Sequence, residues 1–221
     1  PISQSWIDNG VDFDAIYTGY LGSFEQLELV SRFFDRHRED GTLIFVDPAM
    51  ADNGALYKGF TPEFARAMGT VVCSKADIID PNITEAAFML GAEYKEDGTY
   101  DEGYVRDLLQ GLVALGPKKA VLTGVSLEPG RCGVYGLDGQ TGEYFSYFNE
   151  LVDARFHGTG DVFSSTTVGA LLNGFSLDKA LAVAADYTVA CIKETISHPD
   201  HNWYGVDFEA EIPYLLKLIG K

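Results

Sequence analysis

The segment HGTGDVFSS, residues 157–165, contains the residue types that phosphoryl transfer to an alcohol requires. Gly158 and Gly160 flank Thr159, Asp161 follows, and the small apolar run after it predicts a helix. A helix N-terminus presents unpaired N–H groups and partial positive charge, and glycines let that backbone approach an anion. A carboxylate in the first turn can then take the proton of a hydroxyl held beside the anion. From these residues alone, a plain glycine turn whose aspartate only favours the helix dipole remains an equal alternative.

Two acidic motifs accompany the glycine turn, and each follows a predicted buried strand. Residues 47–52 have the sequence DPAMAD, and residues 80–85 have the sequence DPNITE. Mg²⁺ held with nucleotide phosphates needs only one or two protein carboxylates, with water completing its shell. Asp47 and Glu85 are candidates for this role, directly or through water. Helix capping by Glu85 and a loop turn at Asp52 are alternatives of equal weight.

Hydrophobic periodicity and capping signals predict strands that alternate with helices. The expected strands are 13–18, 43–46, 77–79 and 119–123, with a hairpin formed by 133–137 and 144–148. The expected helices begin at residues 23, 62 and 82 and span 101–115, 162–172, 177–194 and 208–219. This order predicts an α/β domain with a mainly parallel sheet and helices on both faces. Ligands bind such sheets at the carboxyl ends of the strands, where four residues would meet: Tyr20, Asp47, Thr123 and Asp161.

Length and charge narrow the class of protein. The 221 residues fit one domain, and 33 acidic against 16 basic residues give a net charge of −17. This excess of negative charge argues against a nucleic acid or an anionic membrane as partner. No apolar run is long enough to predict a membrane-spanning helix. The three cysteines, Cys73, Cys132 and Cys191, are far apart, which indicates reduced thiols in a cytoplasmic protein.

Together, the motifs resemble those of the pyridoxal kinases, which belong to the ribokinase-like superfamily of small-molecule kinases. The sequences YTGYLG at 17–22, DPxMxD at 47–52, PNxTE at 81–85 and GTGD at 158–161 occur in that family's order and spacing. The resemblance covers nearly the whole chain from Phe13 onward. The GTGD motif is shared across the superfamily, whereas GYLG and DPxM point more narrowly to pyridoxal kinases. The resemblance implies a three-layer α/β/α ribokinase-like fold in a single domain over residues 1–221.

The implied activity is ATP-dependent phosphorylation of the 5′-hydroxymethyl group of pyridoxal, and also of pyridoxine and pyridoxamine. Asp161 resembles the base that activates this hydroxyl, and the anion hole for the transferring phosphate would be formed by Gly158, Thr159 and Gly160. Tyr20 resembles a tyrosine that packs on the pyridine ring. The resemblance also implies Mg²⁺, with ATP as co-substrate, leaves a monovalent cation as a further candidate, and implies a homodimer.

The remaining matched residues lie on the nucleotide side. By resemblance, the magnesium and phosphate network would contain Asp47, Asn82 and Glu85, with Asp47 and Glu85 as the metal ligands. The surroundings of ATP would contain Asp52, Tyr57, Thr123 and Thr159. The segment 147–149 would lie towards the adenosine.

The chain departs from the family pattern at three positions and at its front. Ala49 and Ala51 replace the usual valine and glycine, and Ala51 raises the question of whether the loop keeps its backbone shape. Asp80 replaces a threonine or small apolar residue and adds a charge near the predicted metal. Nothing before Phe13 matches the strand, helix and flap with which pyridoxal kinases begin. We therefore expect the natural protein to carry additional N-terminal residues.

Three other functions remain open. Hydroxymethylpyrimidine kinases share the fold; they often carry a cysteine after the glycine turn, as does one branch of the pyridoxal kinases, so Asp161 argues mildly against them. A sugar kinase is a weaker alternative. A non-catalytic protein that binds a nucleotide or a vitamin is the alternative from a different class. Intact Asp161, Glu85 and glycines oppose it, since binding alone needs no base.

Overall fold

The computed structural model describes residues 2–154, 156–201 and 204–221. Its strands are β1 (Ala15–Thr18), β2 (Leu43–Val46), β3 (Ala51–Asp52), β4 (Ala55–Leu56), β5 (Ile78–Ile79), β6 (Lys119–Val125), β7 (Arg131–Asp138) and β8 (Tyr144–Glu150). Its α-helices are α1 (Ile2–Asp8), α2 (Phe24–His37), α3 (Pro62–Ala67), α4 (Ile83–Leu90), α5 (Glu102–Ala114), α6 (Thr159–Leu172), α7 (Leu177–Ser197) and α8 (Ile212–Leu218). A π-helical turn (Met68–Val72) and a 3-10 turn (Cys73–Lys75) follow α3, and a second 3-10 turn (Phe208–Glu211) precedes α8.

The central sheet has the strand order β1-β2-β5-β6-β7-β8. The first four strands in this order are parallel, and β7 and β8 are antiparallel additions. The register places Thr18 opposite Val46 and Val46 opposite Ile79, so the parallel strands end close to one another. Strands β3 and β4 form a separate small hairpin after β2. The mainly parallel α/β fold expected from the sequence is thus confirmed.

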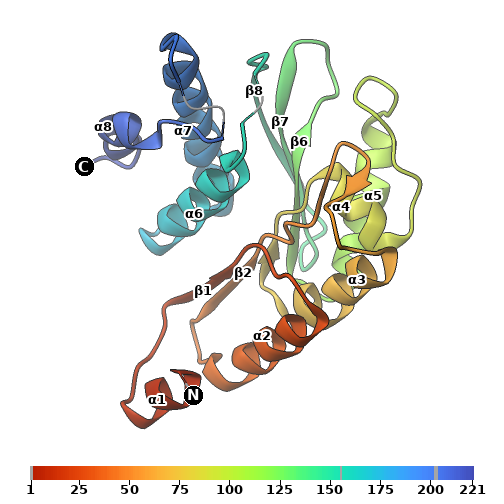
Figure 1. The fold of residues 1–221 in the computed structure, drawn as a ribbon, viewed down its shortest axis with the longest axis vertical. Helices are drawn as coiled ribbons and strands as arrows, with labels where there is room; N and C mark the ends of the chain where they lie inside the picture. Colours follow the sequence, from red (N-terminus) through yellow and green to blue (C-terminus); the bar gives the residue numbers. More distant parts are fainter. Residues whose placement is uncertain (1, 155, 202–203) are drawn as a thin grey trace.

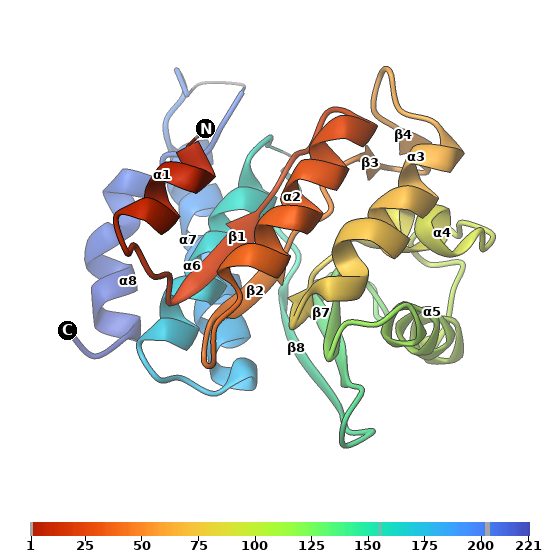
Figure 2. The same cartoon turned by 90° about the horizontal axis from the view of Figure 1, so that it is seen from below.

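Helices cover both faces of the sheet, as Figure 1 shows. Successive side chains of a strand point to opposite faces. Accordingly, Ile44 and Val46 of β2 belong to the core cluster shared with α2, α3, α4 and α5, whereas Phe45 belongs to the cluster shared with α6 and α7. Figure 2 shows the same three layers from another side. Strands β2 and β5 in the middle of the sheet consist of apolar residues only and are almost wholly buried, as is typical of strands covered on both faces.

The helix starts predicted from capping residues are found in the structure at α2, α3 and α4. Asn82 and Glu85 form a complete capping box at the start of α4. At α2, the Ser23 hydroxyl accepts the Gln26 N–H at 3.2 Å, but the Gln26 side chain accepts from Gly22 N–H and not from Ser23. Half of the capping box expected at residue 23 is therefore present.

The structure also contains elements that periodicity did not predict. Helix α1 has seven residues, and none of them is fully buried. It is held by tertiary contacts, in which Trp6 lies 5.3 Å from Phe13 and 5.8 Å from Phe33, between ring centroids. The helix expected over 208–219 is divided, because Pro213 favours a fresh helix start and the preceding turn is 3-10. Among the described helices, none combines the length and the apolar character needed to cross a membrane.

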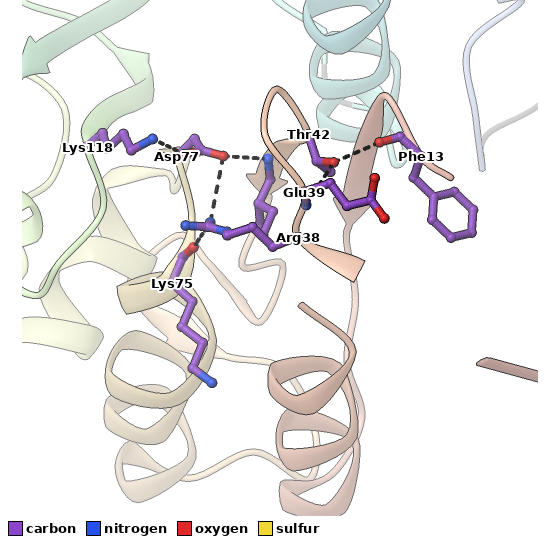
Figure 3. Close-up of polar contacts among 8 residues, drawn as sticks. Phe13, Arg38, Glu39, Thr42, Lys75, Asp77 and Lys118 are labelled. Carbon is purple, nitrogen blue, oxygen red and sulfur yellow. Dashed lines mark hydrogen bonds and ion pairs between the residues drawn. The ribbon is translucent and has the colours of Figure 1, made fainter. Parts of the chain in front are cut away.

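A largely buried carboxylate, that of Asp77, links the strands at the end of the sheet opposite to the predicted site. Asp77, just before β5, accepts the Ile44 N–H at 2.7 Å and pairs with the Lys118 ammonium at 2.7 Å (Figure 3). Arg38, after α2, lies 3.7 Å from the same carboxylate and donates to the Lys75 carbonyl. These contacts join the starts of β2, β5 and β6 and fix the parallel strands side by side.

Replacing Asp77 with alanine should destabilise the fold, because the Ile44 N–H would lose its acceptor in a largely buried position. We expect the free energy of unfolding to fall by about 1–3 kcal/mol. The control is Lys118→Ala, which removes an ammonium whose side chain is 53% exposed and should cost no more than about 1 kcal/mol. Urea denaturation of both variants measures the difference. Equal small losses would show that the N–H contact is unimportant.

Candidate active site

A cavity of about 440 Å³ lies at the carboxyl ends of the parallel strands. Most of the residues predicted from the sequence line it: Asp47, Asp52, Tyr57, Asn82, Glu85, Thr123, Gly158, Thr159, Gly160 and Asp161. Asp47 follows β2, Thr123 lies in β6, and the glycine turn opens α6. The strand-end placement inferred from the sequence therefore brings these side chains to one cavity. Tyr20 is the predicted residue that does not line it.

The N-terminus of α6 borders the cavity with its backbone. Gly158 is the N-cap residue, with φ of +80°, a conformation that glycine adopts without strain. The first bond within the helix runs from the Val162 N–H to the Gly158 carbonyl at 3.0 Å. The N–H groups of the three residues before Val162 have no acceptor inside the helix, as at every helix start. Together with the helix dipole, they can bind an anion at the cavity wall.

Two carboxylates lie beside glycines of the motifs, at distances that an added Cβ atom would meet as ordinary contacts. A Cβ atom at Gly19 would lie 3.6 Å from the Asp161 Oδ1, and one at Gly160 would lie 3.9 Å from the Asp47 Oδ2. Asp161 itself is exposed to solvent, in the first turn of α6. Its carboxylate is thus accessible to a hydroxyl group placed beside the anion-binding N–H groups.

Glu85 ties the two acidic motifs together. Its Oε1 accepts the N–H groups of Met50 at 2.9 Å and Ala51 at 3.4 Å, and its Oε2 accepts the Asn82 N–H at 2.9 Å. The Asn82 side chain donates to the Ala51 carbonyl at 2.8 Å. Burial and repulsion by Asp47 raise the pKa of Glu85 to about 8, although the backbone N–H groups lower it. Ala51, which stands where the family usually has glycine, lies in β3. Its N–H and its carbonyl both take part in this network, so the loop is held in place with alanine at this position.

Asp47 and Asp80 are two further buried acids at the cavity. Burial, with a smaller contribution from Asp161, raises the pKa of Asp47 to about 7. Asp80 is 3% exposed, and burial followed by repulsion from Asp47 raises its pKa well above the usual range. The Asp80 Oδ2 accepts the Ser164 hydroxyl at 2.5 Å, while its Oδ1 has no hydrogen-bond partner within the described parts of the chain. The site therefore gathers acids whose negative charge is disfavoured by burial and by their mutual repulsion.

These acids include the residues predicted to hold a metal ion. In the described residues, no group of three or more His, Cys, Asp or Glu side chains is arranged to hold a metal ion. Glu85 already accepts N–H groups with both oxygens, whereas the buried Asp80 Oδ1 lacks a partner. A cation would offset the mutual repulsion of these acids, so the residues are compatible with one. The assignment of Asp47 and Glu85 as metal ligands stays a prediction.

Tyr20 is not part of the cavity wall. Its side chain is 61% exposed, and its ring centroid is 5.4 Å from that of Phe60. By contrast, Tyr57 lines the cavity, and burial followed by repulsion from Glu85 raises its pKa to about 12. The two tyrosines therefore occupy different places.

In the cavity wall formed by β7, β8 and α7, the sequence predicted only the segment 147–149. Asn149 of this segment lines the cavity, and its amide donates to Asp186 of α7 at 2.8 Å, as does the Tyr147 hydroxyl at 2.9 Å. The unpredicted part consists of residues 132–134, 150–152, 154, 156 and 157, together with Gly124, Phe163, Ser164, Ala185, Thr188, Val189 and Ile192. The α7 positions look like ordinary core residues of an amphipathic helix, so no local pattern distinguishes them.

Comparisons with known proteins agree with this geometry. Residues 5–204 match the family described as phosphomethylpyrimidine kinase. A pyridoxine kinase of Bacillus subtilis is 30% identical over 194 residues, which are 86% of this chain and 67% of that protein. A pyridoxine/pyridoxal/pyridoxamine kinase of Bordetella avium is 29% identical over 184 residues, which are 80% of this chain and 59% of that protein.

A solved structure shows the same fold. It is a putative phosphomethylpyrimidine kinase from Bacteroides thetaiotaomicron, crystallised with pyridoxal, which has a TM-score of 0.89 and 35% identity to this chain. The match covers 97% of this chain and 74% of that one. This chain thus corresponds to part of the length of each of these proteins, about two thirds or less for the curated ones.

The buried acids predict a pH-dependent stability for the metal-free protein. An acid whose pKa rises on folding contributes stability at low pH, and this contribution is lost as the pH rises towards the folded-state value. Asp80→Asn removes such a charge while its side-chain oxygen can still accept from Ser164. We therefore expect the variant to melt at a higher temperature than the wild type at pH 8, with a smaller gain at pH 5.

Thermal melts in the presence of a chelator measure this gain. The exposed carboxylate of Asp107 serves as the matched control, since Asp107→Asn should change the melting temperature little at either pH. A gain for Asp80→Asn that is the same at pH 5 and pH 8 would contradict the electrostatic explanation.

Proposed function

This chain belongs to the phosphomethylpyrimidine kinase family, and we propose that the natural protein transfers the γ-phosphoryl group of ATP to the 5′-hydroxymethyl group of pyridoxal, pyridoxine and pyridoxamine. The observation that carries the proposal is the accessible Asp161 carboxylate beside the N–H groups that open α6. The relatives named as B6-vitamer kinases and the related structure with pyridoxal support this choice of substrate.

In the proposed reaction, each group at the glycine turn has a separate task. Asp161 takes the proton of the substrate hydroxyl, and the hydroxyl oxygen forms a bond to the γ-phosphorus of ATP. The bond from the γ-phosphorus to the bridging oxygen breaks, and ADP leaves with that electron pair. The N–H groups of residues 159 and 160 stabilise the charge on the transferring phosphoryl group, because donors aimed at developing charge lower the barrier.

A divalent metal ion fits the acidic side of the cavity. Bound Mg²⁺ would neutralise phosphate charge and polarise the transferring group. Asp47 is the first candidate to hold it, and the unpartnered Oδ1 of Asp80 is a second. Glu85 would act through water or through the loop that it holds, since both of its oxygens accept backbone N–H groups. The monovalent cation that the resemblance leaves as a candidate remains a prediction without assigned ligands.

The rest of the cavity suits a nucleotide. Its volume of about 440 Å³ is of the size that binds small molecules, in the range of about 300–1,000 Å³. We assign Asn82, Thr123 and Thr159 to the phosphates of ATP. Asp52 and Tyr57, from the segment after β2, also line the cavity and are assigned to the surroundings of the nucleotide. The walls from β7, β8 and α7 are left for the adenosine. A cytoplasmic location and a homodimer, both implied by the resemblance, remain predictions.

A panel of substrates tests the proposed function against its alternatives. The purified natural protein is incubated with ATP and Mg²⁺ and one of pyridoxal, pyridoxine, pyridoxamine, hydroxymethylpyrimidine or ribose, and ADP release is measured. We expect the highest kcat/KM for a B6 vitamer. A higher value for hydroxymethylpyrimidine would favour the alternative kinase, and binding without any turnover would favour a non-catalytic homologue.

Asp161→Asn tests the assignment of the base. The substitution preserves size and removes the proton acceptor, so kcat should fall by roughly 10²–10⁴-fold. The dissociation constant for ATP should change little, and Asp107→Asn should leave both constants unchanged because Asp107 is exposed on α5. Steady-state kinetics and nucleotide titration measure the two effects. Near-normal turnover in Asp161→Asn would refute the assignment.

A further inference from the structure

The ring of Tyr20 is confined on two sides although most of its side chain is exposed. On one side, a Cβ atom at Gly22 would lie 3.3 Å from the Tyr20 Cε1, so the ring folds back over this glycine. On the other side, the Phe60 ring meets it with a centroid distance of 5.4 Å and an interplanar angle of 38°. These two contacts give the ring a defined orientation, while 61% of the residue remains open to a ligand.

Phe60 is itself fixed from the protein core. Its ring stacks on Phe64 with a centroid distance of 4.4 Å and an interplanar angle of 4°, and Phe64 is 3% exposed. Phe64 in turn packs edge-on against Phe24, 5.3 Å away. At the backbone, the Phe60 N–H donates to the Tyr57 carbonyl at 3.1 Å. A row of rings thus runs from the core to Tyr20, with Phe60 as its link.

We propose that Phe60 is a positioning residue, which holds the Tyr20 ring in the orientation that receives the flat aromatic ring of the substrate. The proposal rests on the proposed function, in which Tyr20 packs on the pyridine ring. An exposed tyrosine loses rotamer freedom when a ligand immobilises it, and this loss weakens binding. Phe60 reduces the loss before the substrate arrives, and so favours aromatic substrates without touching the reacting atoms.

The proposed role of Phe60 can be distinguished from that of a residue that only covers the core. A covering role needs apolar volume, which leucine supplies, whereas orienting a neighbouring ring needs an aromatic ring with its preferred offset or edge geometry. The chemistry at Asp161 does not involve Phe60, and the cavity lining does not include it. The proposal therefore predicts a selective effect on the binding of the aromatic substrate.

The test uses the complete natural protein with Phe60 changed to alanine, leucine or tyrosine. For Phe60→Ala we expect the KM and the calorimetric Kd for pyridoxal to rise about three- to tenfold, which corresponds to the usual strength of an aromatic pair. The kcat and the KM for ATP should stay near their wild-type values. Phe60→Tyr should restore pyridoxal binding, and Phe60→Leu should not.

Three further variants make the test independent of any effect of the Phe60 substitutions on folding. Gly22→Ala would displace the Tyr20 ring from its other side and should weaken pyridoxal binding selectively, whereas Gly205→Ala, with open space around its Cβ position, should not. Phe33→Ala removes a ring of similar exposure in the cluster around α1 and serves as the matched aromatic control. It should leave the pyridoxal Kd unchanged.

The proposal fails if Phe60→Leu binds pyridoxal as well as Phe60→Tyr does, or if the KM for ATP rises together with that for pyridoxal. These results would mean that Phe60 only covers the core or supports the loop that carries Tyr57. The wild-type data separate this question from the proposed function. A wild type that binds pyridoxal but does not phosphorylate it would refute the proposed function, and the Kd values of the variants would still decide the role of Phe60. A wild type that binds no pyridoxal would refute both.

Discussion

The carboxylate of Glu85 is the contact on which the shape of the cavity depends. It joins the loop after β2 to the start of α4 by accepting three backbone N–H groups, those of Met50, Ala51 and Asn82. Each of these donors is buried or nearly so, and leaving one without an acceptor would cost about 1–3 kcal/mol. A glutamine could offer only one oxygen, so the position requires an acid for structural reasons alone. Any role of Glu85 towards a metal ion is additional to this one.

The same burial has an electrostatic consequence. Asp47, Asp80 and Glu85 lie close enough to repel one another, and burial raises the pKa of each. A protein of net charge −17 would be expected to repel a nucleotide at long range. At short range, the outcome depends on the N–H groups that open α6 and on a bound cation, both of which favour an anion. For the proposed nucleotide, local dipoles and a bound cation would therefore count for more than the overall charge.

The glycines of the two motifs have different physical roles. At Gly22 the absence of a side chain matters, because a Cβ atom there would lie 3.3 Å from the Tyr20 ring. At Gly19 and Gly160 a Cβ atom would make only ordinary contacts with the Asp161 and Asp47 carboxylates, so both glycines lie beside these carboxylates without being required for space. Their conformational freedom matters mainly at Gly158, where the backbone has a positive φ.

The sequence by itself determined the order of the main strands and helices, the capping of α4 and the acidic and glycine-rich part of the cavity lining. These features follow from period-2 and period-3.6 patterns and from the rule that parallel strands end at one edge of a sheet, and such information is local or topological. Only the tertiary structure decided that Asp80 meets Ser164, which is 84 residues away, and that α7 forms a wall. It also decided that Tyr20 lies outside the cavity lining and beside Phe60. These contacts depend on how separate elements pack, and no spacing within one segment encodes the distance between two of them.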